Sequence, residues 1–160
     1  MSTSVFTELT FRYEKLQVIV GEQNAGKTSL IRKLAAEHDA TSLNLNLELS
    51  KRLLSISKAD WQLQLKGVLQ DILSEQTQPI AFLDNTEILF DIQLQVNPLR
   101  LLKDLSRNQI IVASWNGHLH NGQLIYARPG HPEYRVETNI DFPIIDLNQQ
   151  KNYENKESNA

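Results

Sequence analysis

The chain has 160 residues, a formal net charge of -3 and no cysteine. Its length predicts a single domain, the lack of cysteine excludes disulfides and thiolate metal sites, and the charge gives no sign of an overall basic surface for nucleic acid. The sequence holds neither a long apolar span nor a signal-peptide-like start, so we expect a cytoplasmic protein with no membrane contact.

A phosphate-binding pattern stands near the start of the chain. Residues 21–28 read G-E-Q-N-A-G-K-T, which fits G-x-x-x-x-G-K-T. The apolar run Leu16–Val20 precedes the pattern and a segment of helical spacing, Ser29–Ala36, follows it. This order of strand, loop and helix is the setting that the pattern needs, because the positive end of the helix then points at the bound phosphates.

Each part of the pattern has a chemical task. The glycines let backbone N–H groups converge on phosphate oxygens, Lys27 reaches the β- and γ-phosphates, and the Thr28 hydroxyl ligates Mg²⁺. Two alternatives remain, a turn that binds nothing and a degenerate loop that has lost its nucleotide. We predict nucleotide contacts from Gly21, Glu22, Gln23, Asn24, Ala25, Gly26, Lys27, Thr28 and Ser29.

The next elements alternate between strand and helix patterns. Residues Ser42–Leu49 alternate strictly between leucine and polar residues, which predicts a strand, and we place it at a sheet edge. From Asp60 the apolar residues recur at helical spacing until Pro79 breaks the helix. The run Ile80–Asp84 predicts a strand that is buried on both faces and ends in a carboxylate.

A second helix and two more strands follow. Asn97 and Pro98 predict a helix start, and Gln109–Ser114 predicts another buried strand. Gly117 and Gly122 bracket a predicted loop before a last strand, Gln123–Ala127. Together with the strand before the phosphate-binding pattern, these make five predicted strands.

The alternation of strands and helices predicts an α/β fold of three layers around a mainly parallel five-stranded sheet, with ligand at the carboxyl ends of the strands. We assign residues 15–146 to this domain, 1–14 to an N-terminal segment and 147–160 to a polar, disordered tail. Asp84 ends a strand and is therefore a candidate second Mg²⁺ ligand beside Thr28, although a carboxylate here also serves as a helix N-cap.

Hydrolysis needs a group that orients or activates water. Asn85 stands directly after Asp84, where many ATPases of this kind have a glutamate, and it cannot accept a proton. Glu87 is the substitute, with a helix first-turn carboxylate as the equally weighted alternative. Asn116 and Ser114 are candidates to sense the γ-phosphate, whereas Trp115 is expected to pack. We therefore predict slow or partner-dependent turnover.

Lys27, Glu87 and Asn116 are thus the predicted catalytic residues. For an arginine finger the chain offers Arg107, Arg128 or Arg135, each of which is otherwise a surface residue. The histidines at 118, 120 and 131 lack metal-ligand spacing, and we expect them in loops.

Longer segments resemble one family. The strings G-E-Q-N-A-G-K-T, F-L-D-N-T-E-I-L-F, N-P-L-R-L-L-K-D-L-S-R-N, I-I-V-A-S-W-N-G and L-I-Y-A-R-P-G-H-P-E-Y-R are similar to those of BrxF, the small P-loop proteins of BREX phage-defence systems. The resemblance covers most of the chain. It implies a P-loop NTPase fold of the additional-strand (RecA/AAA+-like) type, with the strand ending at Ser114 between those ending at Val20 and Leu83.

The same resemblance implies a function. It points to a defence component that acts beside a larger ATPase, a DNA methyltransferase and a phosphatase-like protein, in a system that marks host DNA and blocks phage replication. The residues from Gly21 to Ser29 and Asp84 would bind ATP and Mg²⁺. The D-N-x-E segment is also similar to that of some DnaA-like regulators, which likewise lack the usual glutamate.

Two functions of different classes follow from the sequence. One is an ATPase whose turnover drives assembly or remodelling. The other is a nucleotide-gated interaction module, which bound ATP holds in one form for its partners. The residues after the sheet are too few for the helical lid domain of a full AAA+ ATPase, which favours the second function or a homo-oligomer that completes the site. The N-K-x-D pattern of GTPases and the arginine-rich lid of small-molecule kinases are missing.

Overall fold

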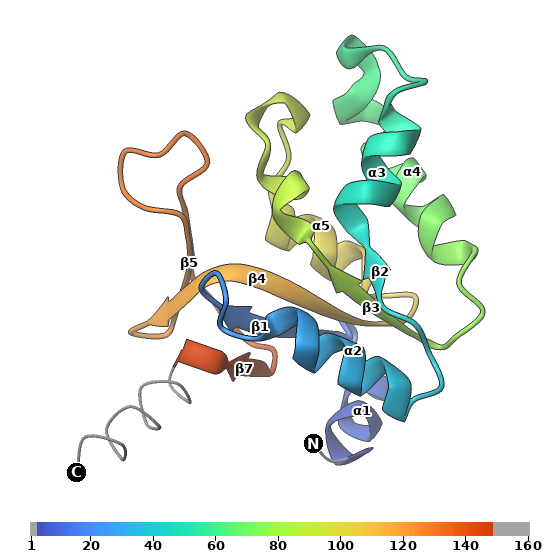
Figure 1. Cartoon of the computed structure of the whole chain (residues 1–160), viewed down its shortest axis with the longest axis vertical. Coiled ribbons are helices and arrows are strands. Elements are labelled where there is room, and N and C mark those ends of the chain that lie inside the picture. Colours follow the sequence, from blue (N-terminus) through green and yellow to red (C-terminus); the bar gives the residue numbers. More distant parts are fainter. Residues whose placement is uncertain (1–2, 149–160) are drawn as a thin grey trace.

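A mainly parallel sheet forms the centre of the molecule (Figure 1). The computed structural model describes residues 3–148. The parallel strands lie in the order β2-β3-β4-β1-β7. Their bounds are Leu16–Gly21 (β1), Leu43–Asn44 (β2), Ile80–Asp84 (β3), Ile110–His120 (β4) and Ile144–Asp146 (β7). The predicted position of β4 between β1 and β3 is confirmed, which brings the ends of these three strands to one edge.

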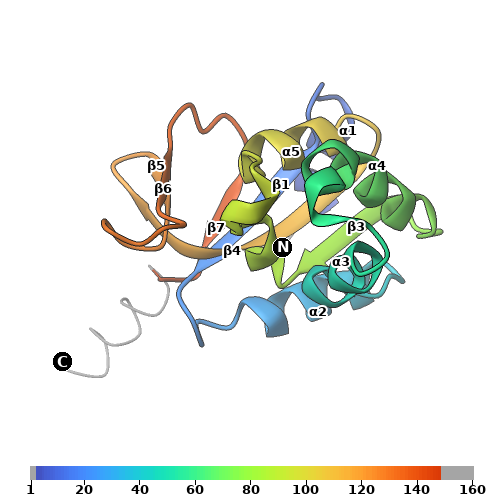
Figure 2. The same ribbon diagram turned by 90° about the horizontal axis from the view of Figure 1, so that it is seen from above.

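Helices cover both faces of the sheet (Figures 1 and 2). On one face lie α1 and α2, and on the other lie α3, α4 and α5. Their bounds are Thr3–Thr10 (α1), Lys27–Glu37 (α2), Leu45–Leu53 (α3), Trp61–Ser74 (α4) and Pro98–Leu105 (α5). Three short 3₁₀ helices are η1 (Lys58–Asp60), η2 (Thr86–Phe90) and η3 (Ile92–Leu94). The predicted α/β architecture with helices on both sides of a mainly parallel sheet is confirmed.

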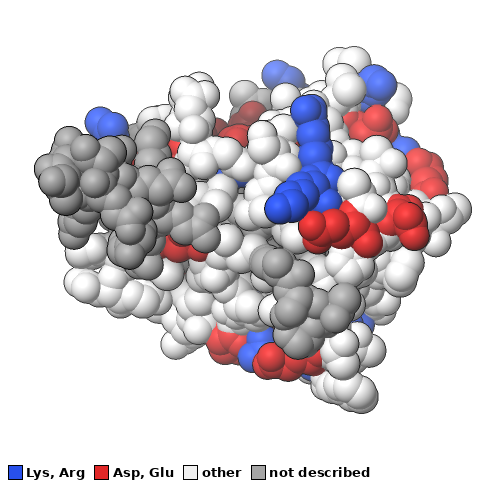
Figure 3. All heavy atoms as spheres, turned by 60° about the horizontal axis from the view of Figure 1, so that its bottom comes forward, with Lys and Arg blue, Asp and Glu red and all other residues white. Residues whose placement is uncertain are grey.

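The surface charges on the side at the bottom of Figure 1 are mixed. In Figure 3, Lys and Arg side chains on this side lie next to Asp and Glu side chains and do not merge into one broad basic area. Within the part of the chain that the structure describes, no helix has the length and apolar character needed to cross a membrane.

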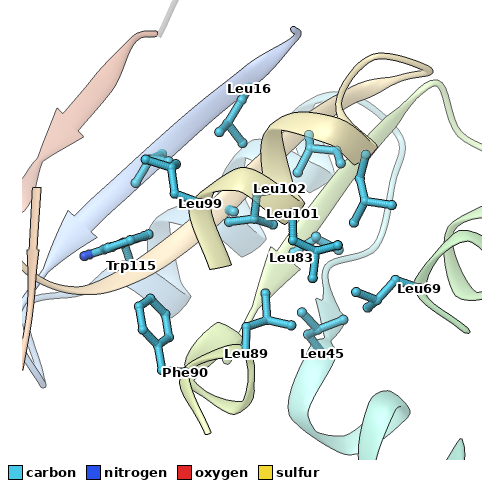
Figure 4. Close-up of a cluster of buried hydrophobic side chains, with 14 of the residues drawn as sticks. Leu16, Leu45, Leu69, Leu83, Leu89, Phe90, Leu99, Leu101, Leu102 and Trp115 are labelled. Atoms are coloured by element: carbon cyan, nitrogen blue, oxygen red, sulfur yellow. The ribbon is translucent and has the colours of Figure 1, made fainter. Parts of the chain in front are cut away.

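The larger core lies between the sheet and helices α3 to α5 (Figure 4). Alternate residues of β1 face it, and because the intervening residues face the other core, the central strands read as nearly continuous apolar runs. The labelled side chains in Figure 4 come from strands, helices and η2: Leu16, Leu45, Leu69, Leu83, Leu89, Phe90, Leu99, Leu101, Leu102 and Trp115. Trp115 is fully buried, as predicted.

The second core lies between the sheet and helices α1 and α2. Phe6 and Leu9 from α1 are buried there together with Ile31 and Leu34 from α2. The Phe6 ring meets the Phe82 ring of β3 edge to face, with the ring centres 6.4 Å apart. The N-terminal segment therefore contributes a helix to the core.

The predicted strand Ser42–Leu49 is wrong over most of its length. Only Leu43 and Asn44 form a strand, β2, which does lie at the sheet edge as predicted. The helix α3 begins at Leu45, because the Asn44 side chain caps it by accepting a hydrogen bond from the Leu47 N–H. The buried leucines at 45, 49 and 53 are spaced as on one face of a helix. The leucines of this segment therefore fit the period of a strand and that of a helix, and packing against α4 favours the helix.

The predicted loop between Gly117 and Gly122 is also wrong. Strand β4 runs on to His120 and turns through Asn121 and Gly122 into the antiparallel strand β5 (Gln123–Tyr126), which pairs with β6 (Arg135–Glu137). Both turn residues have positive φ, the conformation that the Asn-Gly pair favours in tight hairpins. This dipeptide was the signal for the hairpin. The fifth parallel strand is consequently β7 and not β5.

Other predicted elements are confirmed, and the histidines are partly corrected. Strand β3, helix α4 and the Asn97-capped start of α5 lie where the sequence placed them. His118 and His120 belong to β4 and not to a loop, whereas His131 lies outside the strands. Of the predicted tail, Leu147 is buried and Asn148 makes hydrogen bonds, and the rest lies outside the described residues.

Candidate functional site

The loop with the phosphate-binding pattern connects β1 to α2 at the carboxyl edge of the sheet. Gly21 ends β1 and lies beside Asn116 of β4. A side chain at Gly21 would place its Cβ 2.9 Å from the Cβ of Ala25, so only glycine permits the tight curl. Gly26 caps α2 with a φ of 102°, a conformation that favours glycine. The two glycines of the pattern therefore have the structural roles that the motif requires.

Lys27 is the first residue of α2, and its side chain reaches back to the loop. Its Nζ donates to the carbonyls of Gly21 and Glu22, at 2.8 Å each, and to Oδ1 of Asn116 at 3.2 Å. Burial lowers the pKa of Lys27, and the nearby carboxylates of Glu87, Asp84 and Glu22 oppose this effect in that order. The structure therefore brings two of the predicted catalytic residues, Lys27 and Asn116, into direct contact.

Thr28 and Asp84 meet across the site. The Thr28 hydroxyl donates to Oδ2 of Asp84 at 2.7 Å, and the N–H of Asn85 donates to the other carboxylate oxygen at 2.9 Å. Asp84 is 7% exposed. Hydroxyl and carboxylate oxygens are the donors that Mg²⁺ prefers, so this pair fits the predicted metal ligands. The Asp84 side chain therefore bonds to α2 and to the N–H of Asn85. The residue in the N-cap position of η2 is Asn85, and its side chain makes no cap hydrogen bond.

One cavity of about 650 Å³ joins the predicted residues. Its lining includes the predicted metal ligands and all three predicted catalytic residues, but not Ser114, which is buried in β4. The Ser114 carbonyl instead accepts a hydrogen bond from the Thr86 hydroxyl at 2.5 Å, which holds η2 against β4. The lining residues are Gln23, Asn24, Gly26, Lys27, Thr28, Ser29, Asp84, Asn85, Glu87 and Asn116.

The three arginine candidates lie in different places. Arg107 forms ion pairs with Glu14 and Asp104, away from this cavity. Arg135 donates to the carbonyl of Val96 at 2.9 Å. Arg128 is exposed and follows β5, where it lines two smaller cavities together with Asn116. Of the three, Arg128 is therefore the one that borders the site within its own chain.

Asn148 is a contributor that the sequence did not reveal. Its Oδ1 accepts from the N–H of Glu22 at 2.9 Å, and its Nδ2 donates to the carbonyl of Gly117 at 3.0 Å. The side chain thus ties the start of the loop between β1 and α2 to β4. Because 126 positions separate Asn148 from Glu22, no local pattern could have predicted this contact.

Taken together, the site offers a lysine, the first N–H groups of a helix and a pair of hard oxygen donors around one cavity. Such a set can bind a polyphosphate together with a divalent cation. Compared with protein-family models, with curated proteins and with solved structures, the chain gives no match. The geometry of the site therefore carries the functional argument.

Proposed function

We propose that this chain binds ATP with Mg²⁺ in a P-loop NTPase fold of the additional-strand type, as a slow or partner-dependent ATPase. One observation carries the proposal: Lys27, Thr28 and Asp84 line a single cavity at the carboxyl edge of a parallel sheet. The strand order supports it, because β4 lies between β1 and β3, which is the order implied for a P-loop fold of the additional-strand type.

The protein's own groups have distinct roles in this proposal. The N–H groups at the start of α2 and the Lys27 ammonium bind the phosphates, since both present positive charge to one cavity. Thr28 and Asp84 would hold Mg²⁺, which would neutralise charge on the β- and γ-phosphates. Asn116 bonds Lys27 and so positions the ammonium.

Slow turnover follows from the residues after Asp84. Asn85 lines the cavity but has no basic oxygen that could take a proton from water. Glu87 lines the same cavity from η2 and is the remaining carboxylate for that task. Catalysis therefore depends on whether Glu87 can be brought to an attacking water, which is a step that a partner can control.

The second candidate function is a nucleotide-gated interaction module, similar to DnaA-like regulators. Asn85 in place of a glutamate favours it. The resemblance to BrxF supports a BREX-type anti-phage complex as the setting for either function, with other BREX proteins as partners and a homo-oligomer as one mode of assembly. The net charge of -3 gives no sign of an overall basic surface for nucleic acid, so contact with DNA is indirect or unproven in this proposal.

The proposal is tested by thermal unfolding with ATP and Mg²⁺. At about a hundred times its dissociation constant, a bound nucleotide stabilises the folded state by ~2.7 kcal/mol. For a domain of this size that raises the melting temperature by roughly 5–10 °C. Lys27→Ala should abolish the shift, whereas Lys33→Ala, an exposed lysine on the same helix, should keep it. A wild-type protein that no nucleotide shifts would contradict the proposal.

A further inference from the structure

We propose that Arg128 binds the terminal phosphate of ATP from within the same chain and makes the site prefer ATP to ADP. This inference rests on the proposed function, because it deepens the role of the same cavity. It assigns to the β5–β6 connection a task that the phosphate-binding pattern leaves open.

The cavities give Arg128 its place. A cavity of about 270 Å³ is lined by Arg128, by Asn116 and by the first loop residues Glu22 and Gln23. A second, of about 290 Å³, is lined by Arg128, Asn116, Tyr126, Ala127, His131 and Glu133. Asn116 and Gln23 also line the larger cavity around Lys27. Arg128 therefore lies across Asn116 from Lys27.

This arrangement fits the terminal phosphate of a nucleoside triphosphate. Lys27 reaches the β- and γ-phosphates in a loop of this kind, and its Nζ lies 3.2 Å from Asn116 Oδ1. The terminal phosphate thus falls on the side of the loop where Asn116 and Gln23 border the Arg128 cavity. A guanidinium binds phosphate oxygens through two parallel hydrogen bonds. ADP lacks the group that this guanidinium would contact.

The main chain before Arg128 is firmly placed. The Tyr126 ring stacks on Phe90 of η2 with the centres 3.5 Å apart, and Trp115 meets Phe90 edge to face. The Trp115 Nε1 donates to the carbonyl of Ile125 at 3.2 Å. Burial raises the pKa of Tyr126, in keeping with its enclosed ring. Arg128 therefore starts two residues beyond the buried and packed Tyr126 ring, beside cavities that it helps to line.

The residue between Tyr126 and Arg128 adds a second observation. Ala127 has a φ of 64°, a left-handed conformation that is unfavourable for a residue with a Cβ. Such strain persists only where surrounding contacts impose it, and it gathers at ligand-binding positions. Here it ends β5 and turns the chain so that both Ala127 and Arg128 line the cavities next to Asn116.

The other two arginine candidates are engaged elsewhere. Arg107 pairs with Glu14 and Asp104 and lies over the Tyr13 ring at 4.8 Å. Arg135 bonds the Val96 carbonyl and lies 3.8 Å from the Glu137 carboxylate. Among these three described arginines, Arg128 is thus the one whose side chain lines the cavities that adjoin the phosphate loop.

Calorimetric titration of the whole chain with ATP and with ADP, both with Mg²⁺, tests the inference. Arg128→Ala should weaken ATP binding by roughly 10- to 100-fold, the range for a hydrogen bond to a charged group. It should change ADP binding by less than about twofold. Arg128→Lys should fall in between, because lysine keeps the charge but loses the planar fork. Arg107→Ala is the matched control and should leave both affinities unchanged.

The outcomes separate this inference from the proposed function. If the wild type binds neither nucleotide, the proposed function fails and this inference falls with it. If both bind and Arg128→Ala changes ATP and ADP equally, or neither, only the role of Arg128 is overturned. If Arg107→Ala weakens ATP binding but not ADP binding, Arg107 would be the arginine that contacts the terminal phosphate, and the proposed role of Arg128 would likewise be overturned. Should Arg128→Ala fail to fold, Arg128→Gln provides the same comparison.

Discussion

At the scale of single residues, the environment of Lys27 determines what the site can do. Three oxygen atoms, from Gly21, Glu22 and Asn116, surround its ammonium. Glu87 and Asp84 add negative charge nearby, and burial still lowers the pKa of Lys27. The ammonium is therefore partly dehydrated and already ordered beside the cavity, so contact with a phosphate would cost it little further rotamer freedom.

The two carboxylates of the site should respond differently to substitution. We expect Glu87→Gln to lower phosphate release by about 10²-fold or more, since assistance by a general base is worth ~10²–10⁴-fold. ATP affinity should stay nearly constant, because Asp84 and Thr28 are the proposed metal ligands. The measurement is phosphate release under single turnover, alone and with duplex DNA. Glu37→Gln, an exposed glutamate of α2, is the control.

Asn85→Glu gives the converse measurement in the same assay. A large gain in phosphate release would show that the natural asparagine restrains a site that is otherwise assembled. If Glu87→Gln reduces release by less than about threefold, Glu87 cannot supply base assistance of the usual size. Basal release near the uncatalysed rate, unchanged in both variants, would favour the nucleotide-gated interaction module over the ATPase.

At the scale of elements, the β4–β5 hairpin links the site to the surface. The first half of β4 pairs in parallel with β1 and β3, and the second half leaves them to pair with β5. Gly117 lies at this change of partner. A Cβ there would lie 1.9 Å from the Ile125 carbonyl oxygen and 3.0 Å from its carbon. Only glycine lets the two strands approach so closely.

Gly117→Ala should therefore lower the free energy of unfolding by about 2 kcal/mol or more, because the clash is with backbone and must be relieved by a strand shift. Gly67→Ala is the matched control. It lies in the exposed middle of α4 with no atom within 4 Å of an added Cβ, and should stabilise the protein by about 0.5–1 kcal/mol. Urea unfolding measures both, and equal effects would contradict this role of Gly117.

At the scale of the whole molecule, the N-terminal helix α1 closes one face of the sheet. Phe6 is 6% exposed, and its ring meets His38 after α2 and Phe82 of β3 edge to face or at an angle close to it. Phe11, the residue after the end of α1, is 85% exposed. Helix α1 therefore packs between the end of α2 and the sheet. The first residues of α2 belong to the proposed phosphate site.

Phe6→Ala should lower the free energy of unfolding by ~3–5 kcal/mol, the usual effect of removing a buried phenyl ring. A stability of about 5–15 kcal/mol is normal for a domain, so the variant should still fold. Phe11→Ala should change it by less than about 0.5 kcal/mol. Urea unfolding followed by circular dichroism compares the two. A small effect of Phe6→Ala would mean that α1 is not part of the cooperative unit.

Short-range patterns predicted an element correctly wherever the hydrophobic periodicity and the turn or cap residues indicated the same element. The loop between β1 and α2, strand β3 with Asp84 at its end, and the Asn97 cap of α5 all follow from residues within a few positions of each other. Steric and hydrogen-bonding rules act at that range, so these elements could be predicted. The same holds for the hairpin turn at Asn121 and Gly122, whose signal was present but was interpreted as a loop.

The α/β class, the loop between β1 and α2, and the strand end that carries Asp84 are encoded in short-range periodicity and turn chemistry, so they can be predicted from the order of residues alone. Tertiary packing decided the rest. It turned the alternating leucines after Asn44 into a helix by burying one side against α4, and it made β7 the fifth parallel strand. It also brought Asn148 to the loop and placed Arg128, of the three arginines, beside Asn116. Contacts between distant segments depend on how the layers pack, and no local pattern records that.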